Sequence, residues 1–316
     1  MKRFLVKCLV YAVVAMLSIA LFLRILVSFP NEYSRQSHEV NAARQIERMQ
    51  TIDEPKIIII GGSGCSFGLC SPVISDHFQM PVCNTGTHGG MGLLTELNLF
   101  KPYIHKDDIV VVIPEYYSYL NNNYLGEKTA LRILSSTYPI GYKVFSLRQQ
   151  LYLIQHVPSA FKDALISRKT VLKDTTPYSM KALNEYGDVE CYENRSYKRK
   201  ADWYPEKWSY PKFRFQENAV AALMEYDDYC KEKGAIMLVF PSAFKAVNFD
   251  VNKDFVHAIW ESMEKTRLHL VSCPERYRMD DSLFFDNPYH LNHEGVAIRT
   301  NQLIMDMDSA LRVYKN

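Results

Sequence analysis

The sequence predicts an α/β protein: a three-layer α/β/α sandwich around a central parallel sheet, with an N-terminal transmembrane helix and an inserted segment. Uninterrupted runs of Ile and Val at residues 57–60 and 109–113 are typical of strands buried on both faces of a parallel sheet. Segments with helical spacing of apolar residues alternate with such runs, the order expected when helices cover both faces. A long uncharged run near the N-terminus predicts the transmembrane helix.

Residues 1–30 are predicted to be an uncleaved membrane anchor. The run from Cys8 to Leu23 carries no charge, and with its apolar neighbours it reaches the roughly 20 residues that a membrane-spanning helix needs. A cleaved signal peptide is the alternative, but no small-residue cleavage pattern follows the run directly. Basic residues precede the run, so the N-terminus should stay cytoplasmic and the domain extracytoplasmic, periplasmic or on the cell surface. These are Lys2, Arg3 and Lys7.

Residues 31–54 are polar and compatible with helix, and we expect a stalk between the membrane and a domain that covers residues 55–316. Periodicity is lost between about residues 120 and 213, which predicts an insertion over the sheet that could serve as a lid. The predicted strands are 56–60, 80–84, 109–113, 235–240 and 269–271. The predicted helices are 91–104, 143–155, 216–233, 251–266 and 295–312.

Composition excludes several function classes. The chain of 316 residues has a formal net charge of +2, which gives no reason to expect a nucleic-acid partner. Of seven cysteines, the six that follow the anchor would lie in an oxidising compartment and could pair, but their spacing fits no zinc pattern. Because no dinucleotide-binding, Walker or metal-ligand motif occurs, neither a cofactor nor a metal is expected.

Chemistry-bearing residues gather where predicted strands end and in one turn near the C-terminus. Ser63 follows the first strand on a glycine-rich turn, and in a parallel sheet such strand ends meet at one edge, where sites form. Asp286 and His290 lie in a turn before the last helix. A serine, a histidine and a carboxylate that meet only in the fold are the parts of a serine nucleophile system.

These motifs resemble those of the SGNH (GDSL-type) hydrolases, with their SGNH/flavodoxin-like sheet. The segment 62–68 is similar to the first block of that family, which implies that Ser63 is the nucleophile; Ser66 is the second candidate. The segment 84–90 is similar to the second block, which implies that the Gly89 backbone N–H joins the oxyanion hole and leaves His88 as a candidate substrate contact. The turn with Asp286 and His290 is similar to the fifth block.

The sequence departs from the family pattern at two places. The third block normally supplies an Asn to the oxyanion hole, whereas here the strand ends in Glu115 and Tyr116. The Tyr116 hydroxyl is a candidate replacement, and the role of Glu115 is open. The family spaces its Asp and His three residues apart, which would select Asn287, but Asp286 carries the charge that stabilises an imidazolium and is the expected partner of His290.

The resemblance implies a membrane-anchored enzyme of the cell envelope, an esterase or an O-acyl (O-acetyl) transferase. Its substrate would be an acylated polysaccharide or glycan, and a membrane acyl-transfer protein is a possible partner. Membrane-anchored relatives that modify envelope polymers share this layout of an anchor followed by a domain. The alternative is a non-catalytic binding or assembly component of a polysaccharide pathway, which the two departures favour.

Overall fold

The sheet at the centre of the fold is parallel throughout. The structure, a computed structural model, describes residues 2–28, 30–190 and 205–315. Its main sheet has the strand order β2-β1-β3-β4, and every neighbouring pair is parallel. The prediction of an α/β fold with a central parallel sheet is therefore confirmed. The strands are β1 (Ile57–Gly61), β2 (Val82–Asn84), β3 (Ile109–Ile113) and β4 (Ile236–Val239).

The predicted fifth strand is reduced to a single parallel bridge between Val239 and Leu270. It stops there because Ser272 has a positive φ of 72°, which turns the chain out of the extended conformation. With this bridge the sheet has the doubly wound order 2-1-3-4-5, whose reversal point lies between β1 and β3. A separate parallel pair, which the sequence analysis did not predict, joins β5 (Phe244–Lys245) to β6 (Arg278–Met279).

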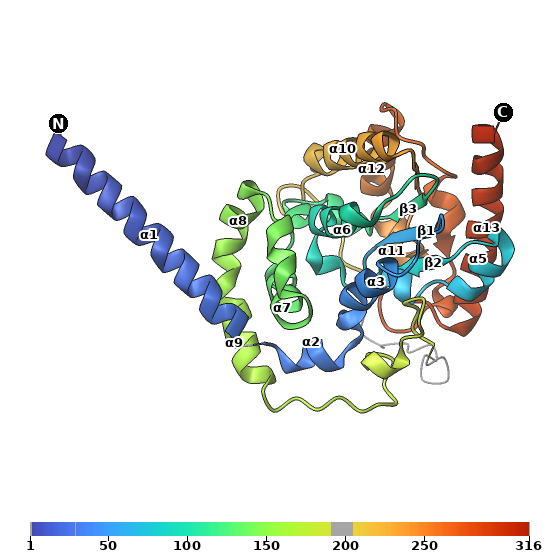
Figure 1. Ribbon diagram of the computed structural model, residues 1–316. Helices are drawn as coiled ribbons and strands as arrows, with labels where there is room; N and C mark the ends of the chain where they lie inside the picture. The colour runs from blue at the N-terminus through green and yellow to red at the C-terminus, as the bar shows by residue number, and fades with distance from the viewer. Residues whose placement is uncertain (1, 29, 191–204, 316) are drawn as a thin grey trace.

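Alternate strand residues face two different hydrophobic cores. Ile58 and Val110 belong to the larger core, whereas Ile59 and Val111 belong to the second one, and all four side chains are fully buried. Figure 1 shows α10 and α12 together on one side of the sheet and α5 beside α13 at another. Helices packing into the larger core are α6 (Leu93–Phe100), α10 (Glu217–Lys233) and α12 (Lys253–Glu264). Those packing into the second are α5 (Ser71–Phe78) and α13 (His293–Lys315).

The segment expected to be a stalk is part of the domain. It folds into α2 (Glu32–Gln36), the 3₁₀ turn η1 (His38–Val40) and α3 (Asn41–Met49), and many of its polar residues are buried. Asn41 Nδ2, for instance, donates to the carbonyl oxygens of Asn84 at 2.9 Å and Gly86 at 2.7 Å. Polar composition suggested solvent exposure, but these side chains instead satisfy backbone groups of the loops around the sheet.

The expected insertion is largely helical. It contains α7 (Lys128–Thr137), α8 (Leu147–Leu153) and α9 (Val157–Ser167), and Ile133 and Leu134 of α7 are buried in the larger core. Residues 191–204 of this stretch lie outside the described residues. The remaining short helices are α4 (Ser63–Ser66) and α11 (Ala246–Val251).

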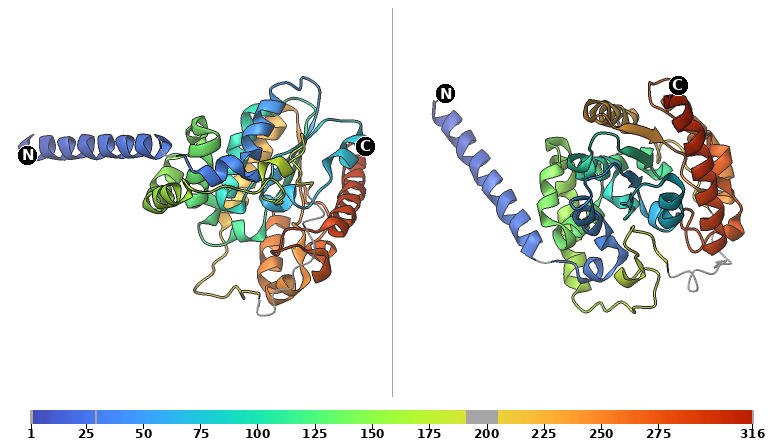
Figure 2. Two further views of the ribbon diagram at one scale, coloured as in Figure 1. Left: turned by 90° about the horizontal axis from the view of Figure 1, so that it is seen from below. Right: turned by 45° about the vertical axis from the view of Figure 1, so that its right-hand side comes forward.

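The N-terminal residues form one helix, α1 (Lys2–Ser28), which projects away from the rest of the protein (Figure 2). Within the described ranges, no helix combines the length and the apolar character required to cross a membrane, so the expected transmembrane helix is not found there. Six cysteines are described, and all six are free thiols: Cys8, Cys65, Cys70, Cys83, Cys230 and Cys273.

Candidate active site

The fold brings the three predicted catalytic residues into one hydrogen-bonded chain. Ser63 opens α4 directly after β1, and its Oγ lies 2.8 Å from Nε2 of His290. Nδ1 of the same ring lies 3.0 Å from Oδ1 of Asp286. The imidazole is therefore placed to take a proton from the serine hydroxyl while the carboxylate fixes its orientation.

The turn that carries His290 explains the choice between the two candidate partners. Asn287 Oδ1 accepts the backbone N–H of Tyr289 at 2.8 Å and that of His290 at 2.9 Å, so its side chain builds the turn. This arrangement uses Asn287 as a local backbone acceptor and turns Asp286 toward the imidazole. The four-residue spacing of Asp286 and His290 therefore has a structural explanation in this turn.

Two aromatic residues hold the imidazole. Phe67 stacks on the His290 ring with a centroid separation of 4.0 Å and an interplanar angle of 8°. The Tyr178 hydroxyl donates to Oδ2 of Asp286 and lies 3.3 Å from Nδ1 of His290. Burial, followed by the charge of Asp286, raises the pKa of Tyr178, which stays a neutral donor. Tyr178 was missed in the sequence because it lies more than 100 residues from its partners in a stretch without periodicity.

Ser66, the second nucleophile candidate, has a structural role. Its side chain is buried, and its Oγ donates to the Gly86 carbonyl oxygen and accepts from Asn41 Nδ2 at 3.3 Å. This contact joins the segment 62–68, which carries Ser63, to the glycine-rich segment 84–90. Ser66 Oγ is thus committed to the backbone, whereas Ser63 Oγ faces His290.

Gly89 lies beside the nucleophile turn, as expected. It begins the 3₁₀ turn η2 (Gly89–Met91), and a Cβ on Gly62 would come within 3.0 Å of its Cα. In the described part of the chain, neither the Ser63 nor the Gly89 backbone N–H has a hydrogen-bond acceptor. Both are thus available to the oxygen of a tetrahedral intermediate.

The prediction for Tyr116 is wrong. Its side chain is only 1% exposed, belongs to the larger core and packs against Phe244 at a ring separation of 5.3 Å. Tyr116 is not among the described residues that line the cavity over Ser63, so its hydroxyl is not placed to bind an acyl group there.

Glu115 occupies the position that Tyr116 was expected to fill. Its Oε1 accepts the Gly64 backbone N–H at 3.1 Å and lies 3.5 Å from Ser63 Oγ. A Cβ on Gly89 would lie 2.3 Å from its Oε2, so the carboxyl group fits between the two glycine turns. Burial raises the pKa of Glu115, while the Gly64 N–H, His290 and Ser63 act in the opposite direction. The sequence placed Glu115 at this strand end and left its role open between a buried pair with a cation and a polar wall of the site.

A cavity of about 580 Å³ opens over these residues, a size typical of small-molecule sites. Ser63, His290, Gly89 and Glu115 line it, and His88 does so as expected for a substrate contact. No group of His, Cys, Asp and Glu suited to a metal ion occurs among the residues that the structure describes. The cavity wall also includes Tyr33, His38, Glu39, Tyr117, Arg132, Tyr178, Trp208 and Phe244.

Comparisons with protein-family models, with curated proteins and with solved structures find no match for this chain.

Proposed function

We propose that this protein is a serine-dependent ester hydrolase or O-acyltransferase of the SGNH type. The observation that carries the proposal is the hydrogen-bonded chain from Ser63 Oγ through His290 to Asp286, at 2.8 and 3.0 Å, open to a cavity. Catalytic hydrogen bonds of this length are those expected of an activated nucleophile.

The reaction would proceed in two acyl transfers. Ser63 Oγ attacks the ester carbonyl carbon while His290 Nε2 takes its proton, and the resulting oxyanion accepts from the backbone N–H groups of Ser63 and Gly89. His290 then protonates the departing alcohol oxygen, the bond from that oxygen to the carbonyl carbon breaks, and an acyl-Ser63 ester remains. Water or a sugar hydroxyl, deprotonated by His290 Nε2, attacks the acyl carbon, the bond from that carbon to Ser63 Oγ breaks, and His290 returns the proton to Oγ. The acceptor decides between hydrolase and transferase.

Glu115 is the proposed substitute for the missing Asn of the third block. A carboxyl group that an apolar site keeps neutral can donate a hydrogen bond to an oxyanion, as an amide does. Glu115 is buried between the two turns that supply the other donors, and burial raises its pKa. In its neutral form it would complete the oxyanion hole.

The proposed substrate is an O-acylated, in the first place O-acetylated, polysaccharide or glycan of the cell envelope, with the protein held at the membrane by its N-terminal helix. The support for this substrate is the sequence resemblance together with a cavity large enough for one or two sugar units.

A fluorophosphonate probe tests the enzymatic proposal directly, because it reacts only with an activated serine. Intact protein should be labelled, and Ser63→Ala should abolish the labelling. A Ser66→Ala variant serves as the matched control and should still be labelled if it folds. Unlabelled folded protein, or labelling that persists in Ser63→Ala, would contradict the proposal.

A non-catalytic binding component is the second candidate, and the carboxyl group of Glu115 beside Ser63 is what favours it. If Glu115 is ionised, its carboxylate, 3.5 Å from Ser63 Oγ, lies near the ester carbonyl oxygen on which negative charge develops during acyl transfer. Such a charge would oppose the oxyanion, and the site would bind an ester or a sugar without turning it over.

A further inference from the structure

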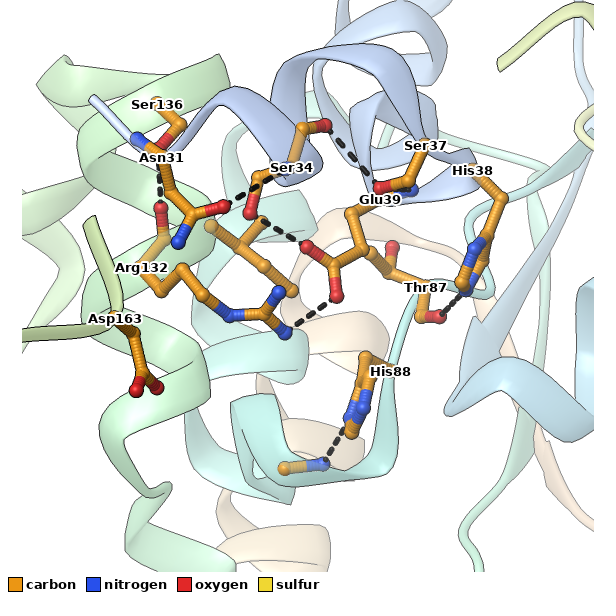
Figure 3. Close-up of polar contacts among 12 residues, drawn as sticks. Asn31, Ser34, Ser37, His38, Glu39, Thr87, His88, Arg132, Ser136 and Asp163 are labelled. Carbon is orange, nitrogen blue, oxygen red and sulfur yellow. Dashed lines mark hydrogen bonds and ion pairs between the residues drawn. The ribbon is translucent and has the colours of Figure 1, made fainter. Parts of the chain in front are cut away.

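The cavity continues away from the catalytic residues into a polar region built by the segment that follows α1. Tyr33 of α2 and Glu39 of η1 line it from one side, and Arg132 of α7 and His88 from the other. Figure 3 shows Arg132 extended toward Glu39, with His88 close to both. Nothing in the catalytic mechanism uses these side chains, although they share one cavity with Ser63.

Arg132 is held in place by a buried carboxylate. Glu39 accepts from Arg132 with Oε1 and from the Ser34 hydroxyl with Oε2, at 2.6 Å, and its side chain is 1% exposed. Glu39 is the only hydrogen-bond partner of the Arg132 guanidinium found among the described residues. Since a guanidinium has five N–H donors, most of them are left to face the cavity.

Of the two neighbouring histidines, His88 adds a donor to the cavity, whereas both ring nitrogens of His38 are buried. His88 Nδ1 accepts the Gly90 backbone N–H at 3.0 Å, so its proton is on Nε2. His38 Nε2 donates to the Thr87 carbonyl oxygen at 3.0 Å, which leaves Nδ1 as an acceptor that is buried and has no partner among the described residues. Burial lowers the pKa of His88 to about 4 and that of His38 to about 3, and neighbouring charged groups act in the same direction.

The charges decide which ligand suits this region. Arg132 and Glu39 cancel, and both histidines are neutral near pH 7, so the region has no net positive charge to attract a carboxylate or phosphate. It offers donors in Arg132 and His88, and it offers the Tyr33 hydroxyl, which can donate and accept, whereas an anion requires donors only. Tyr33 and Tyr178 add aromatic rings to the wall. Sugar hydroxyls donate and accept, and the C–H faces of a sugar ring pack on aromatic rings.

We propose that the Tyr33–His38–His88–Arg132 region is a subsite for a neutral sugar residue, the one that carries or receives the acyl group. This inference rests on the proposed function, because it identifies part of the substrate of the same Ser63. Arg132 and His88 would donate to sugar hydroxyls, the Tyr33 hydroxyl would accept from one, and Glu39 would act as a positioning residue for Arg132.

The subsite continues past Arg132. A second cavity of about 300 Å³ is also lined by Tyr33 and Arg132, together with Lys128 and Asp163, which pair at 2.8 Å, and with Ile166 of α9. Tyr33 and Arg132 line both cavities and so lie between them. Asp163 lies on the side of Arg132 opposite to Glu39 (Figure 3). A glycan chain could extend across them, so oligosaccharide esters should be better substrates than monosaccharide esters.

The test compares a sugar ester with an ester that has no sugar. Arg132→Gln should raise KM for O-acetylated xylo- or cello-oligosaccharides about 10- to 100-fold, the range for losing a charge-assisted hydrogen bond. Its loss on 4-nitrophenyl acetate should be at least tenfold smaller. Arg267→Gln is the matched control, because Arg267 also pairs with a carboxylate, Asp228, but is exposed and outside the cavity wall. It should leave both activities unchanged.

Tyr33→Phe covers the case in which Arg132→Gln does not fold, because it removes only a hydroxyl group. Because the Tyr33 hydroxyl would bond a sugar hydroxyl, this variant should raise KM for the oligosaccharide ester about 3- to 10-fold and leave thermal unfolding unchanged. An unchanged KM for that ester would count against the subsite. Equal losses on both esters would overturn the subsite, as would competition by inorganic phosphate that Arg132→Gln abolishes.

Failure of the subsite and failure of the enzymatic proposal can be told apart. If the protein cleaves neither ester, the proposed function fails, and the subsite is then tested by NMR binding of unacetylated xylo- and cello-oligosaccharides. Binding by the intact protein that is lost in Arg132→Gln would support the subsite. An intact protein that binds none of these sugars would overturn it.

Discussion

Glu115 is the residue on which the chemistry of this site depends most. It stands where the SGNH pattern places a neutral amide, and its carboxyl group reaches both the Gly64 N–H and the Ser63 hydroxyl. An amide donates at every pH, whereas a carboxyl group donates only while it is protonated. Replacing one by the other therefore makes the oxyanion hole sensitive to pH.

Glu115→Gln should keep turnover within about tenfold, because the amide keeps an acceptor for Gly64 and gains a permanent donor, whereas Glu115→Ala should lose about 10²–10³ in kcat. Wild-type activity should fall as the pH rises through the raised pKa of Glu115, since the carboxylate cannot donate. The Gln variant should lack this alkaline fall in a plot of kcat against pH. Equal losses in Gln and Ala would show that the charged form is the one required.

Asp286 and Asn287 should differ sharply in their effect on turnover. If the proposed mechanism holds, Asp286→Asn removes the charge beside Nδ1 of His290 and should lower kcat by about 10⁴, the loss known for the serine triad. Asn287→Ala removes only the acceptor that holds the turn, and we expect a loss of about tenfold together with a lower Tm. Asn287→Asp, which keeps the acceptor, is the control for the turn. A larger loss in Asn287→Ala than in Asp286→Asn would reassign the orienting role.

At the scale of elements, the buried strands were predictable and the segments around the cavity were not. β1 and β3 are runs of Ile and Val that only a sheet buried on both faces accommodates, so pattern alone identified them. The residues 31–54 gave no such pattern because their polar side chains bind backbone groups of loops that are distant in sequence. Tyr178 and Arg132 were not predicted either, because their partners are also distant in sequence. These partners are Asp286 and Glu39. Ser63, His290 and Asp286 were found because their local turns carry a motif.

The hydrogen bonds from α3 to the glycine-rich segment 84–90 should contribute measurably to the free energy of unfolding. Asn41→Ala leaves the carbonyl oxygens of Asn84 and Gly86 buried without this donor and should lower the free energy of unfolding by about 2–4 kcal/mol. Urea denaturation measures this, with Asn218→Ala, an exposed asparagine at the start of α10, as the matched control. Because Ser66 and Gly86 share the network, turnover should fall as well. Equal stability of the two variants would mean that α3 contributes little to the glycine loop.

At the scale of the whole molecule, the cavity is assembled from parts that span almost the entire chain. Tyr33 follows closely after α1, Ser63 and Glu115 end two neighbouring strands, and His290 precedes the last helix. The carboxyl ends of β1 and β3 meet at the reversal point of the sheet, where doubly wound proteins place their ligands. The segment after α1 closes one side of this point, so the N-terminal region forms part of the proposed site.

If α1 is the predicted membrane anchor, its short connection to the cavity wall affects which substrates can reach the site. Only a few residues separate the end of α1 at Ser28 from Tyr33 in the cavity wall, so a membrane-held α1 would keep the cavity near the membrane surface. Such a position favours an insoluble or lipid-linked glycan over a soluble one.

The topology follows from the basic residues before the apolar run, which should keep the N-terminus in the cytoplasm and place the domain outside. An alkaline phosphatase fused after Asn316, which is active only outside the cytoplasm, should therefore be active and should stay in the membrane fraction after an alkaline carbonate wash. The same fusion beginning at Asn31 should be inactive, because it lacks the export segment. An inactive full-length fusion would place the domain in the cytoplasm, away from envelope glycans. Activity released into the soluble fraction would instead show that the segment is cleaved as a signal peptide, and the proposed proximity of the cavity to the membrane would then be lost.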